Sequence, residues 1–537
     1  MGLSVITSRA LDGLGAPVVS VEVHLANGLP SFTLVGLADT EVKEARERVR
    51  SALAHSSYGF PHNQRITVNL APADLPKESG RFDLAIALGI LAAQGHLDEG
   101  ALARHEFAAE LSLAGQLRPV RGALALALAA RADGPLAKAL VLPPGSAEEA
   151  ALVEGVTVYR ATHLQEVVQA LQLEGAVPLT RVYPGAGGAS GSAEGGSLSF
   201  SGDAGPGSGA LAPARPYAPD LQDIRGQHQA KRALEVAAAG SHSLLLIGPP
   251  GSGKSMLAQR LSGLLPPLSD EQALSSAAVA SISSLGFDHR RWRQRPYRAP
   301  HHSASAAALI GGGSPPRPGE ISLAHHGVLF LDELPEFQRR GLEALREPLE
   351  TGHIQLSRAA RQSTYPSQFQ LVAAMNPCPC GWLGSAGQGG RLCRCTPDAV
   401  LRYQGRISGP LLDRIDLQVE VQALPAHELL RAPSGETSAQ VAQRVSQARA
   451  RQLQRQGKTN DQLSSADIHT HCALSMAAQH FAQQVAERLG WSGRSLHRVM
   501  KVARTVADLA QAEHIAVDHL AEAVQWRRGL ATGHTGA

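Results

Sequence analysis

Apolar and polar residues alternate along three stretches near the N-terminus, which predicts β-strands because period-two alternation places every second side chain on one face. The stretches are Val18–Leu25, Phe32–Val35 and Ile66–Leu70. Between and after them, Glu41–Ala54 carries apolar residues at helical spacing, and Phe82–Ala93 is a more uniformly apolar helical stretch. Strands mixed with helices in this way predict an α+β domain over residues 1–184.

The pattern is lost over the next segment. Residues 185–209 are rich in Gly and Ser and nearly uncharged. A segment of this composition cannot bury enough apolar surface to fold, so we expect residues 185–215 to form a flexible linker.

Beyond the linker, short runs that are apolar at every position predict strands buried on both faces of a parallel sheet. The runs are Leu244–Ile247, Val328–Leu331 and Leu371–Met375. From residue 434 the periodicity becomes helical throughout, over Thr437–Gln456, Ser475–Leu489, Gly493–Ala512 and Val517–Arg528, with Ser492 as the expected N-cap of the third helix. We therefore expect an α/β domain at 216–433 and a helical domain at 434–537.

Composition fits a chain of several domains. Of 537 residues, 43% are hydrophobic and 18% charged, and the formal net charge is only +3. This charge excludes a strongly basic nucleic-acid coat but allows a local basic patch. The N-terminus lacks the apolar core of a signal peptide, and the most apolar run, Gly122–Ala130, is too short to span a bilayer. We expect a cytoplasmic protein without a membrane partner.

A phosphate-binding loop follows the first buried strand. The sequence GPPGSGKS fits the P-loop pattern GxxxxGK[ST], in which backbone N–H groups and the start of the next helix converge on phosphates. The loop comprises Gly248, Pro249, Pro250, Gly251, Ser252, Gly253, Lys254 and Ser255. Lys254 is expected to reach the β- and γ-phosphates, and Ser255 to bind Mg²⁺.

A second motif completes the nucleotide site. The strand at Val328–Leu331 runs into Asp332 and Glu333. We expect Asp332 to hold the magnesium shell, and Glu333 to polarise the attacking water as general base. Together the two motifs predict a Mg²⁺-dependent ATPase.

Four longer segments carry a family resemblance. GPPGSGKS, LFLDE, LVAAMNPCPCG and SGPLLDRIDLQVEV, together with YRAPHHSAS, resemble the ComM/YifB family of magnesium-chelatase-like AAA+ ATPases over nearly the whole chain. The resemblance implies an AAA+ αβα module with a C-terminal helical lid. It also implies a hexameric ring that moves along DNA as a helicase and drives branch migration of recombination intermediates in natural transformation, with recombination proteins as possible partners.

The same resemblance implies roles for three further residues. Asn376 would be the first sensor that positions the lytic water, Arg414 the arginine finger that reaches a neighbouring subunit's γ-phosphate, and Arg494 the second sensor. For each arginine the alternative is an ordinary salt bridge.

Two arginine-containing segments without any acidic residue suggest contact with DNA, because arginines neutralise phosphates and nearby aromatic rings can stack on bases. In the family these positions correspond to hairpins that face the pore of the ring. The candidate residues are Arg291, Arg293, Arg295 and Arg298 in the first segment, and Arg358 and Arg361 in the second. The alternative is that these arginines pair with carboxylates elsewhere or face solvent. His301 and His302, beside the first segment, receive no role.

Cysteine usage points to a metal. Four of the five cysteines form a C-x-C…C-x-C pattern, at Cys378, Cys380, Cys393 and Cys395. Paired cysteines on a glycine-rich loop in a reducing compartment favour a structural Zn²⁺, although the usual zinc pairs are C-x2-C and four free thiols are the alternative.

The N-terminal stretch Ile66–Leu91 is similar to the Lon-protease-type domain with an S5-like fold. Where active Lon proteases place the nucleophile, this chain has Arg81, Phe82 and Asp83, so we expect a non-proteolytic scaffold. Two other functions remain open. A magnesium-chelatase motor subunit, which drives metal insertion into a porphyrin, would have the same nucleotide site, and a Lon-like protease is disfavoured by the missing catalytic pair.

Overall fold

The computed structural model describes residues 2–36, 44–75, 77, 80–172, 176–184, 219–284, 286–313, 316–358, 361–384, 392–425, 433 and 435–527. The predicted linker at 185–215 lies outside this description. The chain divides into two compact units, of which unit 1 comprises residues 1–201 and 270–292, and unit 2 comprises 202–269 and 293–537. Within the described residues, no helix combines the length and apolar character needed to cross a bilayer.

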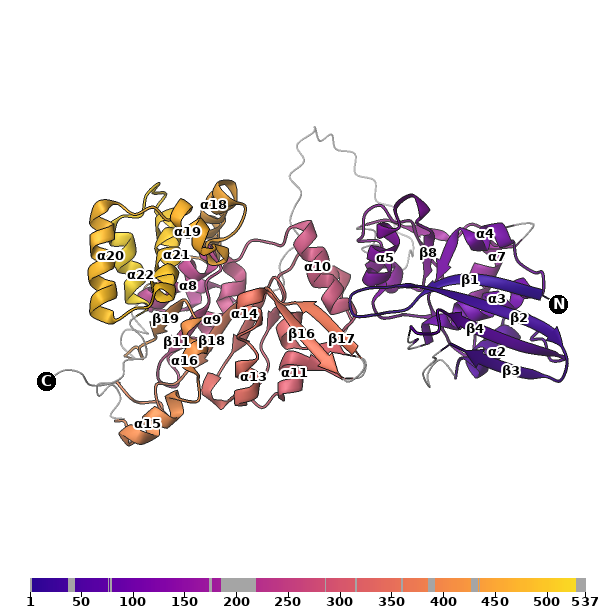
Figure 1. The fold of residues 1–537 in the computed structure, drawn as a ribbon, viewed down its shortest axis with the longest axis horizontal. Helices are drawn as coiled ribbons and strands as arrows, with labels where there is room; N and C mark the ends of the chain where they lie inside the picture. Colours follow the sequence, from indigo (N-terminus) through magenta and orange to yellow (C-terminus); the bar gives the residue numbers. More distant parts are fainter. Residues whose placement is uncertain are drawn as a thin grey trace, which may run out of the picture. The chain divides into compact units, whose positions relative to one another are not determined.

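Unit 1 contains the strands predicted near the N-terminus (Figure 1). Its first sheet has the order β1-β2-β4-β3 and consists of β1 (Gly2–Arg9), β2 (Val18–Asn27), β4 (Gln64–Ala71) and β3 (Ser31–Val35). The β1–β2 and β2–β4 pairs are antiparallel, and β3–β4 is parallel. Helix α3 (Asp83–Ala93) packs on β1 and β2, and α2 (Ala45–His55) packs on α3. Their buried side chains form one apolar core.

A second sheet of unit 1 has the order β10-β9-β8-β5. Its strands are β5 (His105–Phe107), β8 (Ala139–Leu142), β9 (Val158–Arg160) and β10 (Thr180–Val182), and the accompanying helices are α4 (Glu99–Ala103), α5 (Ala123–Ala132), α6 (Ser146–Ala150) and α7 (Leu164–Ala170). A short antiparallel pair, β6 (Glu110–Leu111) and β7 (Leu117–Arg118), lies outside both sheets. Unit 1 is thus α+β, as the sequence pattern predicts.

One helix of unit 1 comes from the middle of the predicted ATPase range. Helix α10 (Asp270–Ser281) contacts α5, and Ala277 and Ala278 join the apolar cluster of α5, α6 and β8. The Gly122 N–H, which precedes α5, donates to the carbonyl oxygen of Ser281 at 3.1 Å. The predicted range 216–433 is therefore interrupted at 270–292, because the apolar side of α10 finds its partners in unit 1.

Unit 2 is built on a five-stranded sheet in which every pairing is parallel. The order is β12 (Tyr297–Arg298), β15 (Val328–Leu331), β18 (Gln370–Met375), β11 (Leu244–Ile247) and β19 (Leu417–Glu420). Every residue of β11, β15 and β18 is buried, which explains why these strands are apolar at consecutive positions. Ligands bind such sheets beyond the carboxyl ends of the strands, where the P-loop lies.

Around this sheet lie α8 (His228–Gly240), α9 (Lys254–Leu264), α11 (Ala306–Ile310), α12 (Glu320–Leu323), α13 (Arg339–Glu343), α14 (Pro348–Thr351), α15 (Pro397–Gln404) and α16 (Gly409–Asp413). Two antiparallel hairpins connect them: β13 (Gly311–Gly312) with β14 (Arg317–Pro318), and β16 (His353–Arg358) with β17 (Arg361–Pro366).

The C-terminal helices, yellow in Figure 1, begin at α18. They are α18 (Ser438–Gln456), α19 (Ser465–His471), α20 (Met476–Leu489), α21 (Gly493–Leu509) and α22 (Val517–Gln525). The Ser492 hydroxyl accepts a hydrogen bond from the Ser495 N–H, which confirms Ser492 as an N-cap. Helices α18 and α21 both pack on α8, and buried Arg449 of α18 donates to the Ala238 carbonyl at the end of α8.

Candidate nucleotide site and metal centre

The P-loop joins β11 to α9 through a turn that depends on glycine. Gly251 and Gly253 have φ of +78° and +91°, a region that other residues rarely adopt. At Gly248 a Cβ atom would lie 2.2 Å from the carbonyl oxygen of Val421, so the strand and loop can approach only without a side chain. Helix α9 begins at Lys254, and its N-terminus therefore opens into this loop.

Lys254 is nearly buried, with 9% of its surface exposed. Its ammonium group donates to the carbonyl oxygens of Gly248 and Pro249, at 2.7 and 2.9 Å, and to Asn376 Oδ1 at 3.2 Å. Burial lowers the pKa of Lys254, while the carboxylates of Asp332 and Glu333 act in the opposite direction. The lysine is thus held between the P-loop and the residue that follows β18.

The predicted magnesium residues are in contact. Ser255 Oγ donates to Asp332 Oδ2 at 2.6 Å. Since Asp332 follows β15, Asn376 follows β18 and the P-loop follows β11, three neighbouring parallel strands end at one place. The structure therefore brings together the P-loop, the carboxylates and the sensor residue that the sequence motifs single out.

Glu333 has a partner that the sequence analysis left unassigned. His302 Nδ1 lies 2.9 Å from Glu333 Oε2, and the ring of His301 lies 4.1 Å from that of His302, centroid to centroid. Glu333 itself has φ of +53°, a left-handed conformation that is uncommon for a non-glycine residue. In the sequence, His302 lies in the motif YRAPHHSAS, well upstream of the strand that ends at Asp332 and Glu333, so local patterns gave no signal for this contact.

Arg414 and Arg494 converge on one carboxylate. The side chain of Arg414 is buried, pairs with Glu350 and donates to the Pro410 carbonyl at 2.7 Å. Arg494 is 64% exposed and lies 3.8 Å from the same Glu350. The hydrogen bond from Arg414 lowers the pKa of Glu350 below its usual value. Their roles as arginine finger and second sensor stay predictions.

Two of the arginines predicted to bind DNA have structural partners instead. Arg295 donates to the carbonyl oxygens of Pro266 and His326, both at 2.7 Å, and burial lowers its pKa to about 10. Arg298 makes two hydrogen bonds of 2.6 Å to the carboxylate of Glu320. Pairing with a carboxylate thus describes Arg298, because Glu320, the first acidic residue after the segment, folds back onto it. Backbone carbonyl oxygens, and no carboxylate, are the partners found for Arg295 among the described residues.

The other DNA candidates are placed differently. Arg291 and Arg293 are exposed. Arg358 and Arg361 are opposite one another in the register at the end of the β16–β17 hairpin, and their side chains lie outside the described residues. The second segment thus forms the hairpin that the resemblance implies, whereas the first segment, described over residues 289–298, ends in β12 of the parallel sheet and forms no hairpin. That either segment faces the pore of a ring stays a prediction.

The four clustered cysteines come within reach of one metal ion. Their Sγ atoms all lie within 4.8 Å of one another, and three of the separations are 3.4, 3.7 and 3.6 Å. A disulfide would require about 2.05 Å. Four thiolates around tetrahedral Zn²⁺, at about 2.3 Å from the ion, lie about 3.8 Å apart, close to the separations found. The donor set therefore fits a thiophilic ion, and the unusual one-residue spacing of the pairs does not prevent convergence.

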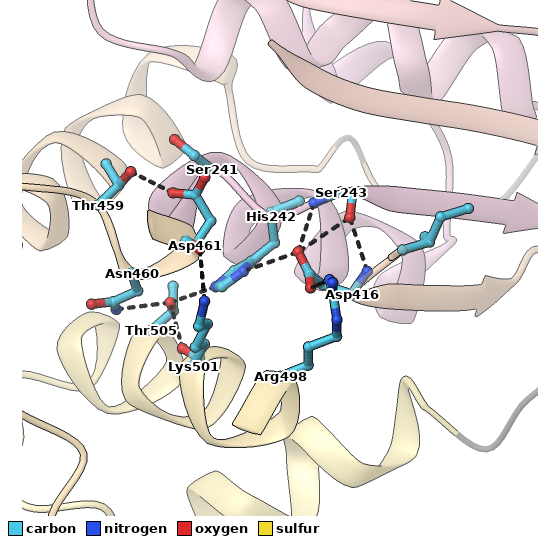
Figure 2. A network of polar contacts seen from close by, with 12 residues as sticks. Ser241, His242, Ser243, Asp416, Thr459, Asn460, Asp461, Arg498, Lys501 and Thr505 are labelled. Carbon is cyan, nitrogen blue, oxygen red and sulfur yellow. Dashed lines mark hydrogen bonds and ion pairs between the residues drawn. The ribbon is translucent and has the colours of Figure 1, made fainter. Parts of the chain in front are cut away.

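A buried polar network fastens the C-terminal helices to the sheet, and the sequence analysis did not find it (Figure 2). Asp416, just before β19, accepts from the Ser243 N–H at 3.1 Å and from Arg498 of α21 at 2.8 Å. His242 hydrogen-bonds to Thr505 of α21 at 2.7 Å. These contacts join residues far apart in the sequence, so periodicity and motifs gave no signal for them.

Comparison with known proteins shows the family. Three family models match the chain. The model for magnesium chelatase subunit ChlI matches residues 220–429. A second model, for subunit ChlI of Mg-chelatase, matches residues 21–146, and a model for the C-terminal region of ChlI matches residues 435–527. Competence protein ComM of Haemophilus influenzae is 48% identical over 98% of each chain. The chain belongs to the ComM/YifB family of magnesium-chelatase-like proteins. Another relative, the uncharacterized protein YifB of Escherichia coli, is 48% identical over 98% of this chain and 97% of its own.

A magnesium chelatase itself is a more distant relative. The magnesium-chelatase 38 kDa subunit of Cereibacter sphaeroides is 24% identical over 37% of this chain and 58% of its own length. The full-length likeness is thus to the ComM/YifB proteins, and the likeness to the chelatase subunit covers only part of the chain.

Proposed function

We propose that the chain is an ATP-hydrolysing ring motor that moves along DNA and drives branch migration of recombination intermediates. One observation carries the ATPase part of this proposal: Lys254 is hydrogen-bonded to Asn376, and Ser255 to Asp332, at the carboxyl ends of three parallel strands. A lysine at the start of a glycine-turned helix is a phosphate site, and the adjacent carboxylate and hydroxyl can hold a hard cation.

The residues present fit ATP and Mg²⁺. Ser252 Oγ is buried in the P-loop without a hydrogen-bond partner among the described residues, as expected of a group that faces a bound phosphate. The 2.6 Å contact of Ser255 with Asp332 brings two oxygen atoms together, which supports a magnesium site because Mg²⁺ prefers oxygen ligands. Bound Mg²⁺ would neutralise charge that develops on the transferred phosphoryl group.

In this assignment Lys254 binds the terminal phosphates, Asn376 orients the attacking water and Glu333 accepts its proton. Glu333 is bonded to His302 in the structure, so the base has to leave this contact before it can act. Arg414 would act as arginine finger in a hexamer and Arg494 as second sensor. Both then have to exchange Glu350 for a nucleotide phosphate when the ring forms.

The proposed binding partner is DNA. The proposed process is natural transformation, and the proposed location is the cytoplasm. The name of the Haemophilus relative, a competence protein, supports this choice. Arg358 and Arg361 at the end of a hairpin, with exposed Arg291 and Arg293, are the proposed DNA contacts. Arg295 and Arg298 are left out because backbone carbonyls and Glu320 bind them.

We further propose that residues 1–184 form a Lon-like scaffold without protease activity, and that residues 434–537 act as the lid. At the place of the Lon nucleophile, Asp83 is buried and paired with Arg48 at 2.6 Å. An ion pair of this kind supplies no nucleophile. The four cysteines are proposed to bind a structural Zn²⁺.

ATP hydrolysis with and without DNA tests the main proposal. We expect forked or four-way DNA to stimulate hydrolysis, and ATP-dependent strand displacement on the same substrates. Lys254→Ala should abolish both activities, because the phosphates lose their cation. A hydrolysis rate that no form of DNA changes would instead favour the second candidate, a chelatase-type motor subunit, which the ChlI profiles support.

The hairpin is tested separately. Arg358→Ala combined with Arg361→Ala should weaken DNA binding while ATP affinity is unchanged. A matched control removes two exposed arginines elsewhere, Arg131→Ala with Arg488→Ala, and thus the same charge. If both double variants lose DNA affinity equally, the hairpin is not a specific contact and only the overall charge matters.

A further inference from the structure

The four cysteines lie next to the nucleotide site in the chain as well as in space. Cys378 is two residues beyond the sensor Asn376 and is fully buried. Gly381, which has φ of +84°, packs so closely on the P-loop that a Cβ atom there would lie 2.5 Å from Cδ of Pro250. The segment that carries the first cysteine pair therefore follows the sensor residue directly and packs against the phosphate loop.

The sulfur atoms of the two cysteine pairs meet although the pairs are separated in the chain. Cys393 Sγ lies 3.7 Å from Cys378 Sγ and 3.6 Å from Cys380 Sγ. These separations are close to the roughly 3.8 Å expected between thiolates around a tetrahedral Zn²⁺. The geometry of the sulfur atoms therefore fits a metal site.

Helix α15, which begins two residues after Cys395, binds back to the sensor segment. Gln404 Nε2 of α15 donates to the carbonyl oxygen of Pro377, the residue after Asn376, at 2.9 Å. Pro377, directly after the sensor, is thus tied to α15, and the two cysteine pairs meet in the described parts of the segment between them. A metal ion bound by all four thiolates would hold the two cysteine pairs together.

We propose that a tetrathiolate metal ion at these four cysteines is a positioning element of the ATPase, which holds Asn376 in register with Lys254. The inference rests on the proposed hydrolysis of ATP but not on the action on DNA. The cysteines touch neither nucleotide nor water in this role. They act through Asn376, whose Oδ1 lies 3.2 Å from Lys254 Nζ, and through the contact of Gly381 with Pro250.

The expected consequence is specific. The carbonyl oxygens of Gly248 and Pro249 hold Lys254 independently of the cysteine loop, so ATP binding should survive loss of the metal. Positioning of the lytic water should not survive, because Asn376 loses its anchor. Metal removal should therefore lower kcat by about 10- to 100-fold while the Kd for ATP changes little.

The test uses the full chain purified with zinc under reducing conditions. We expect about one zinc per chain, and the ligand-field absorption of a tetrahedral tetrathiolate site after replacement by Co²⁺. Cys393→Ser with Cys395→Ser should lose the metal and show the kcat effect. Cys472→Ala, which removes the buried thiol outside the cluster, should retain both metal and kcat.

If the double variant fails to fold, the wild-type protein is stripped with a chelator and then reloaded with zinc. Amide exchange of residues 376–381 should rise on stripping and fall on reloading. Absence of metal from the wild-type protein, or unchanged kcat and exchange after stripping, would overturn the inference. If the chain hydrolyses no ATP in any form, the proposed function fails, and metal content and amide exchange still decide whether the metal braces this segment.

Discussion

A buried carboxyl group in unit 1 permits a quantitative prediction. Glu149 of α6 is 7% exposed and accepts a hydrogen bond from the Leu124 N–H at 3.1 Å. Burial raises its pKa from 4.5 to about 7. This shift corresponds to about 3 kcal/mol, because one pKa unit is worth about 1.4 kcal/mol. The folded protein thus binds this proton more tightly than the unfolded chain.

The sign of the pH dependence follows from this difference. The stabilisation by protonated Glu149 is fully present below pH 4.5 and is lost as the pH rises to about 7. In Glu149→Gln a neutral carboxamide can still accept from Leu124. Near pH 4.5 we expect the free energy of unfolding of the variant to equal that of the wild type. At pH 8 we expect the free energy of unfolding of the variant to be about 3 kcal/mol higher than that of the wild type.

Urea unfolding at several pH values measures this effect if the signal comes from unit 1 alone. Trp292 is the only one of the four tryptophans in unit 1 and packs beside the same apolar cluster. The ¹⁹F resonance of fluorotryptophan at this position therefore reports its unfolding. Burial raises the pKa of Asp83 to about 6. Because Asp83 is present in both proteins, its contribution to the pH dependence cancels when the two profiles are subtracted. Parallel pH profiles of the two proteins would refute the reasoning.

Three further predictions concern unit 2. Arg498→Met leaves buried Asp416 without its guanidinium partner, and we expect a loss of roughly 3–5 kcal/mol in urea unfolding; a loss under about 1 kcal/mol would contradict the role given to this pair. His302→Ala frees Glu333 from its contact and should raise basal ATP hydrolysis by up to about fivefold, the value of a partly exposed pair. An unchanged or lower rate would show that the contact does not restrain the base. Arg298→Ala should lower the melting temperature and leave DNA affinity unchanged, and a DNA-binding defect would restore this residue to the interface.

Local patterns predicted the parts of the fold that depend on local interactions. The runs at Leu244–Ile247 and Val328–Leu331 are strands with those limits, because a strand buried on both faces must be apolar throughout. Helix α21 ends at Leu509, three residues before the predicted end, and Gln511 beyond it has φ of +60°. Helix ends depend on such backbone turns, which apolar periodicity does not report.

Pairings between distant residues could not be predicted. The absence of acids from residues 289–319 suggested free arginines, yet Glu320 pairs with Arg298. The same limit applies to Asp416 with Arg498, whose partnership depends on how the C-terminal helices dock. Motifs located the nucleotide site because its residues follow strands that must be adjacent, whereas His302 needed the folded chain to show its contact with Glu333.

The position of α10 in unit 1 has a consequence for where the gene can be divided. A gene fragment that lacked the first 184 codons would still encode Ala277 and Ala278, without the apolar partners they have in α5 and α6. Such a truncated product would leave the apolar side of α10 without these partners. The two units are thus encoded by interleaved stretches of the chain.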